Sequence, residues 1–276
     1  MKKIKLGFMQ GRLSPPIRNK IQAFPFSTWK KEFKVAKEIN FKIMEWTIDN
    51  FNYFKNPIMT NSGKKEINKL KEKYNIKINS ITCDFLMQDT FYKKNKITKY
   101  SENNFYNFLK NCGQIKIKTI VVPLVDGSSI KNFDEEKNII SFFSNIENFL
   151  KKNKISIAFE SDFNLDKLNR FIDKFNPELF GINYDIGNSA GLNYNYKKEM
   201  QAYFDRIKNV HIKDKNKKNI TVPLFSGKAQ ILEVIKFLIC NGYNGNFILQ
   251  PARSYFDHIN MIKNYGKIFS NYASKI

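Results

Sequence analysis

Eight short apolar runs alternate along this sequence with longer segments of helical periodicity, and that alternation restricts the fold more than any other feature. The strand-like runs cover residues 4–9, 42–46, 76–82, 119–124, 155–160, 179–185, 207–213 and 246–250. The helical segments cover residues 28–39, 64–74, 102–115, 134–152, 165–175, 197–204, 230–241 and 258–272. In the first helical segment Trp29, Phe33 and Ala36 recur at spacings of three and four, which gives one apolar stripe. Strand and helix repeated in this way predict a parallel sheet covered by helices.

Such a sheet is either a closed barrel or a doubly wound open sheet, and two observations favour the barrel. No glycine-rich dinucleotide fingerprint follows the first strand, where the sequence reads GFMQGRLSP. Polar residues capable of chemistry stand at the carboxyl end of nearly every strand, as they do in barrel enzymes. We therefore expect an α/β fold, a single (β/α)8 TIM barrel over residues 1–276. The long connections 49–61 and 85–100 are candidates for lids or pocket walls.

The last four strands end on residues that suit a metal site. Glu160 ends the fifth strand, Asp185 the sixth and Gln250 the eighth, and His211 lies in the seventh. A barrel brings the ends of consecutive strands together around one mouth. One imidazole and three oxygen ligands suit Mn²⁺, Co²⁺, Mg²⁺ or Zn²⁺, with positions left for water and substrate oxygens. We therefore expect a divalent metal ion bound by these four residues.

Each of these residues, taken alone, has a structural explanation. A strand-end carboxylate is commonly a helix cap or a salt-bridge partner, and His211 between Val210 and Ile212 is compatible with a core histidine. The corresponding position of all four in successive units is what favours the metal site. The chain has only two histidines, and one of them falls in this register.

Several stretches resemble the xylose isomerase-like TIM-barrel superfamily of sugar phosphate isomerases and epimerases. They are GFMQGRLSP, AFESD, NYDIGNSAG, KNVHIKD, TVPLFSGKAQ and NFILQPAR. That superfamily also includes the endonuclease IV branch, inosose dehydratase and ketose 3-epimerases. The resemblance covers essentially the whole chain and is sharpest over residues 155–253. It implies that Glu160, Asp185 and His211 occupy the metal-binding positions and that the substrate is a small carbohydrate.

Gln250 departs from the family pattern, because most relatives have a fourth metal-binding glutamate there. A glutamine oxygen can still coordinate a metal, but it carries no charge and is not a useful base. Epimerisation with proton transfer on opposite faces normally needs two bases. An aldose–ketose isomerisation through an enediolate needs only one, for which Glu160 is the best candidate, with a metal stabilising the enediolate. A metal-dependent dehydratase acting on a cyclic polyol or keto acid is the alternative, since it also needs one base.

Other residues at the mouth are candidates for substrate binding. Glu45 ends the second strand and could bind a substrate hydroxyl, act as a further acid or base, or form a structural ion pair. Asn188 stands three residues after Asp185, where some relatives have a substrate-binding histidine. Lys213 and Arg253 follow the last two strands, the usual phosphate corner of a barrel, and suit a phosphate or carboxylate.

The formal net charge of +22 raises the question of nucleic-acid binding. The lysines are spread along the whole chain, and the sequence is equally rich in Asn, Ile, Tyr and Phe, which share AT-rich codons. We attribute the charge to composition and expect no specific nucleic-acid recognition. An endonuclease IV-like repair enzyme is disfavoured because that branch fills a multi-metal site with many histidines.

The remaining features concern location, assembly and one further alternative. No apolar run of about 18 residues occurs, so no membrane segment is expected. Cys83, Cys112 and Cys240 have no paired spacing, which fits a reducing cytoplasm. A barrel that binds carbohydrate without catalysis is a further alternative, for which Gln250 is the sole argument. A homo-oligomer is compatible with the sequence.

Overall fold

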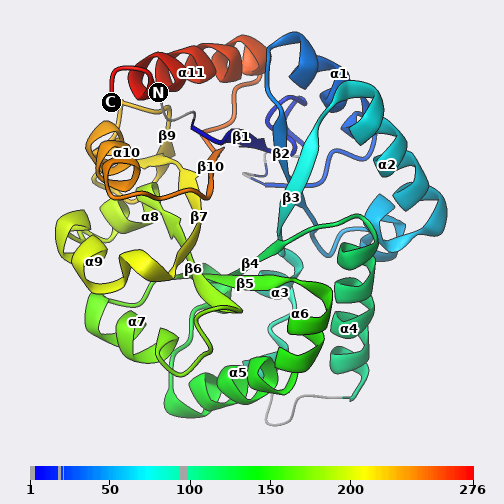
Figure 1. Cartoon of the computed structure of the whole chain (residues 1–276), viewed down its shortest axis with the longest axis vertical. Helices are drawn as coiled ribbons and strands as arrows, with labels where there is room; N and C mark the ends of the chain where they lie inside the picture. The colour runs from blue at the N-terminus through cyan, green and yellow to red at the C-terminus, as the bar shows by residue number, and fades with distance from the viewer. Residues whose placement is uncertain (1–3, 18–19, 21, 94–98) are drawn as a thin grey trace.

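The structure, a computed structural model, describes residues 4–17, 20, 22–93 and 99–276. Eight parallel strands close into a barrel in the order β1-β10-β7-β6-β5-β4-β3-β2 (Figure 1). Their bounds are β1 Leu6–Met9, β2 Ile43–Thr47, β3 Lys77–Thr82, β4 Thr119–Leu124, β5 Ser156–Ser161, β6 Phe180–Asp185, β7 Ile207–Ile212 and β10 Asn246–Leu249. The predicted α/β TIM-barrel architecture is therefore confirmed.

Helices surround the barrel and cover its outer face (Figure 1). Their bounds are α1 Trp29–Glu38, α2 Asn61–Tyr74, α3 Phe85–Gln88, α4 Lys99–Gln114, α5 Phe133–Asn145, α6 Glu147–Asn153, α7 Leu165–Ile172, α8 Ile186–Gly191, α9 Tyr196–Tyr203, α10 Ile231–Cys240 and α11 His258–Ala273. Short 3₁₀ helices lie in the connections: η1 Tyr53–Lys55, η2 Pro57–Met59, η3 Phe91–Lys93, η4 Asp126–Ser128 and η5 Phe204–Arg206.

The alternation of side chains along each strand determines which residues enter the barrel. In β5, the ring of Phe159 packs against Phe143 of α5 and Phe171 of α7, on the outer face. Neighbouring side chains of a strand point to opposite faces, so Glu160 points into the barrel. The same alternation in β7 places His211 inside and its neighbours Val210 and Ile212 outside.

Apolar side chains share the barrel interior with the polar ones. Met9, Ile43 and Ile248 form a small buried cluster of their own. Gly7 is required beside them, because a Cβ there would lie 2.7 Å from the side chain of Ile43 and 2.9 Å from that of Ile248. In the strand register Met9 pairs with Glu45 and Ile248 pairs with His211, so these apolar side chains lie beside the polar residues of the interior.

Three local features differ from the sequence-based expectation. The single helix expected over residues 134–152 is wrong: the chain forms α5 and α6, with a break at Ile146, which is buried and leaves helical geometry. The short helices α3 and α8 were not expected. Nor was an antiparallel hairpin, β8 (Asp214–Lys215) with β9 (Thr221–Val222), which follows β7. In the part of the chain described, no helix is both long and apolar enough to span a bilayer.

Candidate metal and catalytic site

Three of the predicted metal ligands converge at the carboxyl ends of adjacent strands. Glu160 lies in β5, Asp185 ends β6 and His211 lies in β7, and all three are buried. One ligand atom from each residue lies within 4.8 Å of the others. We call these three residues the ligand cluster. Two carboxylates and an imidazole in this arrangement have the composition of a site for a divalent transition metal.

His211 is held between two carboxylates. Its Nε2 donates to Oε1 of Glu45 at 2.6 Å, and its Nδ1 lies 3.2 Å from Oε2 of Glu160. The side-chain amide nitrogen of Asn183 also lies 3.0 Å from Nδ1. Burial lowers the pKa of His211, but the charges of both glutamates outweigh it and raise this pKa to about 10. The ring is therefore fixed, with Nε2 toward Glu45 and Nδ1 toward Glu160.

Glu45 is fully buried and surrounded by donors. Ser80 and Thr82 donate to it from β3 at 2.6 Å each, and Asn209 donates from β7 at 2.8 Å. With His211 these donors use the four acceptor positions of the carboxylate. Burial acts to raise the pKa of Glu45, but the charge and hydrogen bond of His211 outweigh burial and bring this pKa below its usual value. The group is therefore ionised. Glu45 thus lies behind His211, across the barrel from β7.

Both carboxylate oxygens of Glu160 accept hydrogen bonds from asparagine side chains. Asn183 donates to Oε2 and Asn188 to Oε1, each at 2.7 Å. Burial acts to raise the pKa of Glu160, but the hydrogen bond and charge of His211, together with the charge of Lys213, bring it below its usual value. Glu160 is therefore an ionised carboxylate of fixed orientation.

Asp185 combines two roles. Its Oδ1 accepts from the backbone nitrogen of Asn188 at 2.7 Å and caps the start of α8. Its Oδ2 lies 3.4 Å from Nζ of Lys213, which also lies 3.4 Å from the amide oxygen of Asn188. Burial and the nearby Glu160 raise the pKa of Asp185, although Lys213 opposes this. The pKa of Lys213 is raised in turn because Asp185 and Glu160 outweigh its burial.

The fourth predicted ligand, Gln250, directly follows β10. Its backbone nitrogen donates to the oxygen of Ile212 at 2.9 Å and extends the pairing of β10 with β7. The side chain is buried, and its Oε1 has no hydrogen-bond partner in the part of the chain that is described. A buried amide oxygen without a donor is rare in proteins, so this acceptor is available to a ligand.

The two predicted anion-binding residues occupy different positions. Lys213 is directed at Asp185, as described above. Arg253 donates to backbone carbonyls of the segment after β1, namely those of Gly11 and, at 3.1 Å, Pro15. The structure thus brings Lys213 and Asn188 to the ligand cluster, while Arg253 braces the loop after β1.

Two further residues of the site, Asn183 and Asn209, were not selected from the sequence alone. Asn183 and Asn209 lie on the same inward faces as Asp185 and His211, two residues earlier in each strand, so the period of two could have identified them. Asp84, two residues beyond the end of β3, accepts from Thr47 at 2.9 Å. Burial raises the pKa of Asp84 to about 7, with a smaller contribution from Glu160.

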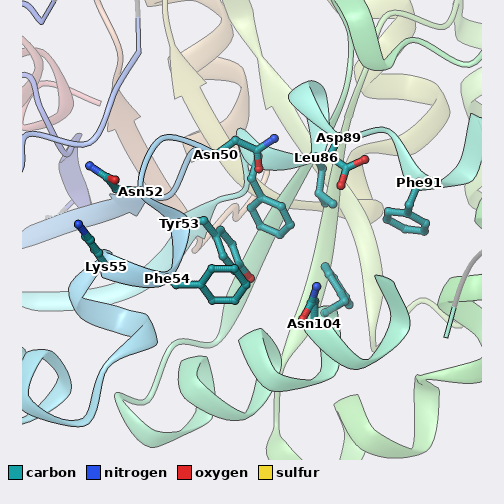
Figure 2. A pocket seen from close by; sticks show the side chains of 11 residues that line it. Asn50, Asn52, Tyr53, Phe54, Lys55, Leu86, Asp89, Phe91 and Asn104 are labelled. Carbon is teal, nitrogen blue, oxygen red and sulfur yellow. The ribbon is translucent and has the colours of Figure 1, made fainter. Parts of the chain in front are cut away.

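A pocket of about 420 Å³ lies apart from the ligand cluster. It is formed by the connections after β2 and β3 and by α4, the first two of which were expected to act as lids or walls. In Figure 2 Tyr53 and Phe54 lie on one side of this pocket, with Leu86, Phe91 and Asn104 around the rest. No residue of the ligand cluster lines it. Its lining includes Asp89 and Lys55, but the described residues of this pocket hold no group of metal-ligating side chains, so we base function on the ligand cluster.

Comparison with solved structures gives the same architecture over the full chain. A xylose isomerase domain protein from Planctomyces limnophilus has a TM-score of 0.75 and 12% identity, covering 100% of this chain and 99% of its own. The IolI protein with a binding zinc atom has a TM-score of 0.74 and 14% identity, and a D-tagatose 3-epimerase-like protein has 0.73 and 17%, each covering 99% of both chains. These identities establish a shared fold.

Sequence comparison places the chain within a family. No curated protein matches the sequence. The model of the xylose isomerase-like TIM barrel, however, matches residues 33–265, which include every residue of the ligand cluster. This chain therefore belongs to the xylose isomerase-like TIM barrel family.

Proposed function

We propose that this chain is a divalent-metal-dependent isomerase or epimerase that acts on a sugar or sugar phosphate through an enediolate, with Glu160 as the base. The observation that carries the proposal is the ligand cluster, two buried carboxylates and one imidazole with ligand atoms within 4.8 Å of one another. The family and the D-tagatose 3-epimerase-like neighbour support a sugar-modifying reaction.

The ligand cluster and Gln250 fit a divalent ion such as Mn²⁺, Co²⁺, Mg²⁺ or Zn²⁺. Oxygen and imidazole ligands suit these ions. Gln250 has a buried amide oxygen to contribute, which has no partner in the described ranges of the chain. Histidine ligands usually donate their second nitrogen to a carboxylate, as His211 does to Glu45. When bound, the ion would supply positive charge that polarises a substrate carbonyl and stabilises the enediolate.

Glu160 meets the requirements for the base. Its pKa lies below the usual range, so the carboxylate is ionised at neutral pH and can accept a proton. Asn183 and Asn188 hold its two oxygens, which fixes the direction from which it approaches a substrate carbon. A single base can move the proton between adjacent carbons on one face, which is the aldose–ketose interconversion that we favour.

Glu45 is a positioning residue in this proposal. Its four hydrogen-bond partners leave it no free acceptor for a substrate hydroxyl. It instead holds His211 and compensates the charge of the imidazole. The missing glutamate at position 250 is therefore not replaced as a base by Glu45.

An epimerase that uses two bases is the second candidate, and Asp84 is the observation in its favour. This carboxyl is buried, has one donor in Thr47, and has a pKa of about 7, which suits proton transfer at neutral pH. Product stereochemistry distinguishes the two candidates. Inversion at a ketose carbon that is lost in Asp84→Asn would replace the one-base isomerase by the two-base epimerase.

The proposal is tested by turnover of a panel of aldoses, ketoses and their phosphates in D₂O with added Mn²⁺ or Co²⁺. We expect stereospecific deuterium incorporation at one carbon, with some internal return of the original proton. Glu160→Gln should lower turnover by about 10²-fold or more while the protein stays folded, because the base is removed. Glu178→Gln, at an exposed position, is the matched control and should leave turnover unchanged. Full activity of Glu160→Gln would refute the assignment of the base.

A further inference from the structure

Two buried hydrogen-bond donors directly after β1 lack partners. The Nη2 atom of Arg12 and the Nε2 atom of Gln10 have no hydrogen-bond partner among the residues described. Arg12 is only 2% exposed and Gln10 is 0% exposed. Most buried polar atoms in proteins are paired, so two unpaired donors on residues two apart in the segment after β1 point to a missing acceptor.

Both side chains are fixed by their remaining atoms. Arg12 donates through Nε to the backbone oxygen of Pro251 at 3.0 Å and through Nη1 to Oε1 of Gln22 at 2.7 Å. Gln22 donates in turn to the backbone oxygen of Gln10 at 3.1 Å. The amide oxygen of Gln10 accepts from the backbone nitrogen of Thr47 at 3.2 Å. We call Gln10, Arg12 and Gln22 the β1 corner.

The charge of Arg12 has no counter-ion within hydrogen-bond reach in the described part of the chain. Burial and the nearby Arg253 lower the pKa of Arg12 to about 9, which the more distant Asp84 and Glu32 only partly oppose. The carboxylate of Glu32 is used by the backbone nitrogens of Gly11 and Leu13. A buried charge without a paired anion is costly, so the site favours an anion from outside.

The β1 corner belongs to the same mouth as the ligand cluster. β1 pairs with β10 on one side and β2 on the other, and Arg12 contacts Pro251, the residue after Gln250. The positive charge of Arg12 also acts to lower the pKa of Lys213, and Lys213 contacts Asp185 of the ligand cluster. An anion bound to Arg12 would therefore lie beside the proposed reaction centre.

We propose that Arg12 and Gln10 form a subsite for an anionic group of the substrate, a carboxylate or a phosphate. This inference rests on the proposed function for the identity of the ligand as a sugar derivative. The free guanidinium nitrogen and the amide nitrogen supply two donors, and the guanidinium supplies the charge that a neutral sugar would leave uncompensated. The substrate class is thus a sugar acid or sugar phosphate. Arg253 is instead directed at the loop after β1, where Nη1 donates to Gly11 and Nη2 to Pro15.

The test measures binding to the full chain after metal removal, so that neither metal nor turnover enters. Glycolate and inorganic phosphate are the anionic probes, and glycerol is the neutral probe, all followed by titration calorimetry. We expect one anion to bind at least about tenfold more tightly than glycerol. The tighter of the two identifies the group as carboxylate or phosphate. Arg12→Met should weaken that binding about tenfold or more.

Arg170→Met is the matched control, because Arg170 is exposed on α7 and its loss changes the net charge equally. Unchanged binding in this variant shows that the effect is local. Should Arg12→Met not fold, Gln10→Met tests the second donor and is expected to weaken binding several-fold. Equal affinity of the folded Arg12→Met or Gln10→Met variant and wild type, or wild-type affinity for anions no greater than for glycerol, would overturn the subsite. Anion binding without sugar turnover would instead count against the proposed function alone.

Discussion

The ligand cluster and the β1 corner are both buried at the carboxyl end of the barrel, but they differ in how far their polar side-chain atoms are hydrogen-bonded. In the ligand cluster the oxygens of Glu160 and Asp185 accept from Asn183, Asn188 and Lys213. In the β1 corner two donors remain without a partner among the residues that the structure describes. A site whose internal bonds are complete holds its geometry before a ligand arrives. One with unpaired donors is completed by a group from outside, so the first region suits a resident ion and the second a substrate.

The largest effect is expected from removing a member of the ligand cluster. Asp185→Ala and His211→Ala should reduce bound divalent metal from about one ion per chain to a trace. Each variant removes one ligand from a site whose only negative charges are two carboxylates. Metal analysis after dialysis against buffered Mn²⁺ or Zn²⁺ measures this. Asp205→Ala, at an exposed position, is the control. Full metal content in both variants would show that the ligand cluster is an internal ion-pair network.

A smaller effect should follow from weakening the support of His211. Glu45→Gln keeps the shape of the side chain but removes the charge that the imidazole faces at 2.6 Å. Loss of such an outer partner typically lowers metal affinity about 10–100-fold. Competition with a chelator of known affinity gives the change, and circular dichroism checks the fold. Unchanged affinity would mean that Glu45 stabilises the barrel interior without orienting a metal ligand.

Gln250→Glu tests whether residue 250 belongs to the metal site. The added carboxylate enters a buried position whose present oxygen has no donor, so without metal it should destabilise the protein. With metal bound, the extra charge should raise affinity by roughly tenfold. We therefore expect a larger metal-induced rise in Tm for the variant than for wild type. An equal rise in both proteins would place residue 250 outside the metal site.

The sequence was sufficient to predict the barrel and the residues that converge in it. Glu160, Asp185 and His211 stand at strand ends, and parallel strands of known order bring such ends together. The alternation of side chains also carried the information for Asn183 and Asn209. Asparagine is so frequent in this chain, however, that two more of them gave no distinct signal.

Long-range pairing is what the sequence could not provide. Glu45 and His211 are 166 residues apart and meet only across the closed barrel, so no local pattern indicates that Glu45 faces an imidazole. The break at Ile146 was missed for a related reason. Ile139, Phe143 and Ile146 keep a helical spacing across it, and packing against the barrel decides where the helix ends. The unpaired donors of the β1 corner likewise become visible only when every neighbouring acceptor is placed.

The smallest effect concerns Glu32, which supports the β1 corner through the backbone nitrogens of Gly11 and Leu13. Burial raises the pKa of Glu32 from 4.5 to about 7, although these hydrogen bonds oppose the shift. The folded protein therefore binds this proton more tightly than the unfolded chain. The resulting stabilisation is complete below the unfolded pKa near 4.5 and is lost as the pH rises through about 7. From about pH 6 to about pH 7.5 this group should cost about 1 kcal/mol of unfolding free energy.

Glu32→Gln removes this titration. Over the same pH interval the unfolding free energy of the variant should therefore fall by about 1 kcal/mol less than that of wild type, as measured by urea unfolding. Glu38→Gln, an exposed position on the same helix, should retain the wild-type pH dependence. Comparing the slopes of unfolding free energy against pH between variants isolates Glu32 from Asp84 and His211, whose raised pKa values also reduce stability as the pH rises.

Identical slopes in wild type and Glu32→Gln would mean that Glu32 is ionised throughout this pH interval. Glu32 would then carry a full negative charge that acts on Arg12 without contacting it, and the need of the β1 corner for an external anion would be weaker than we infer.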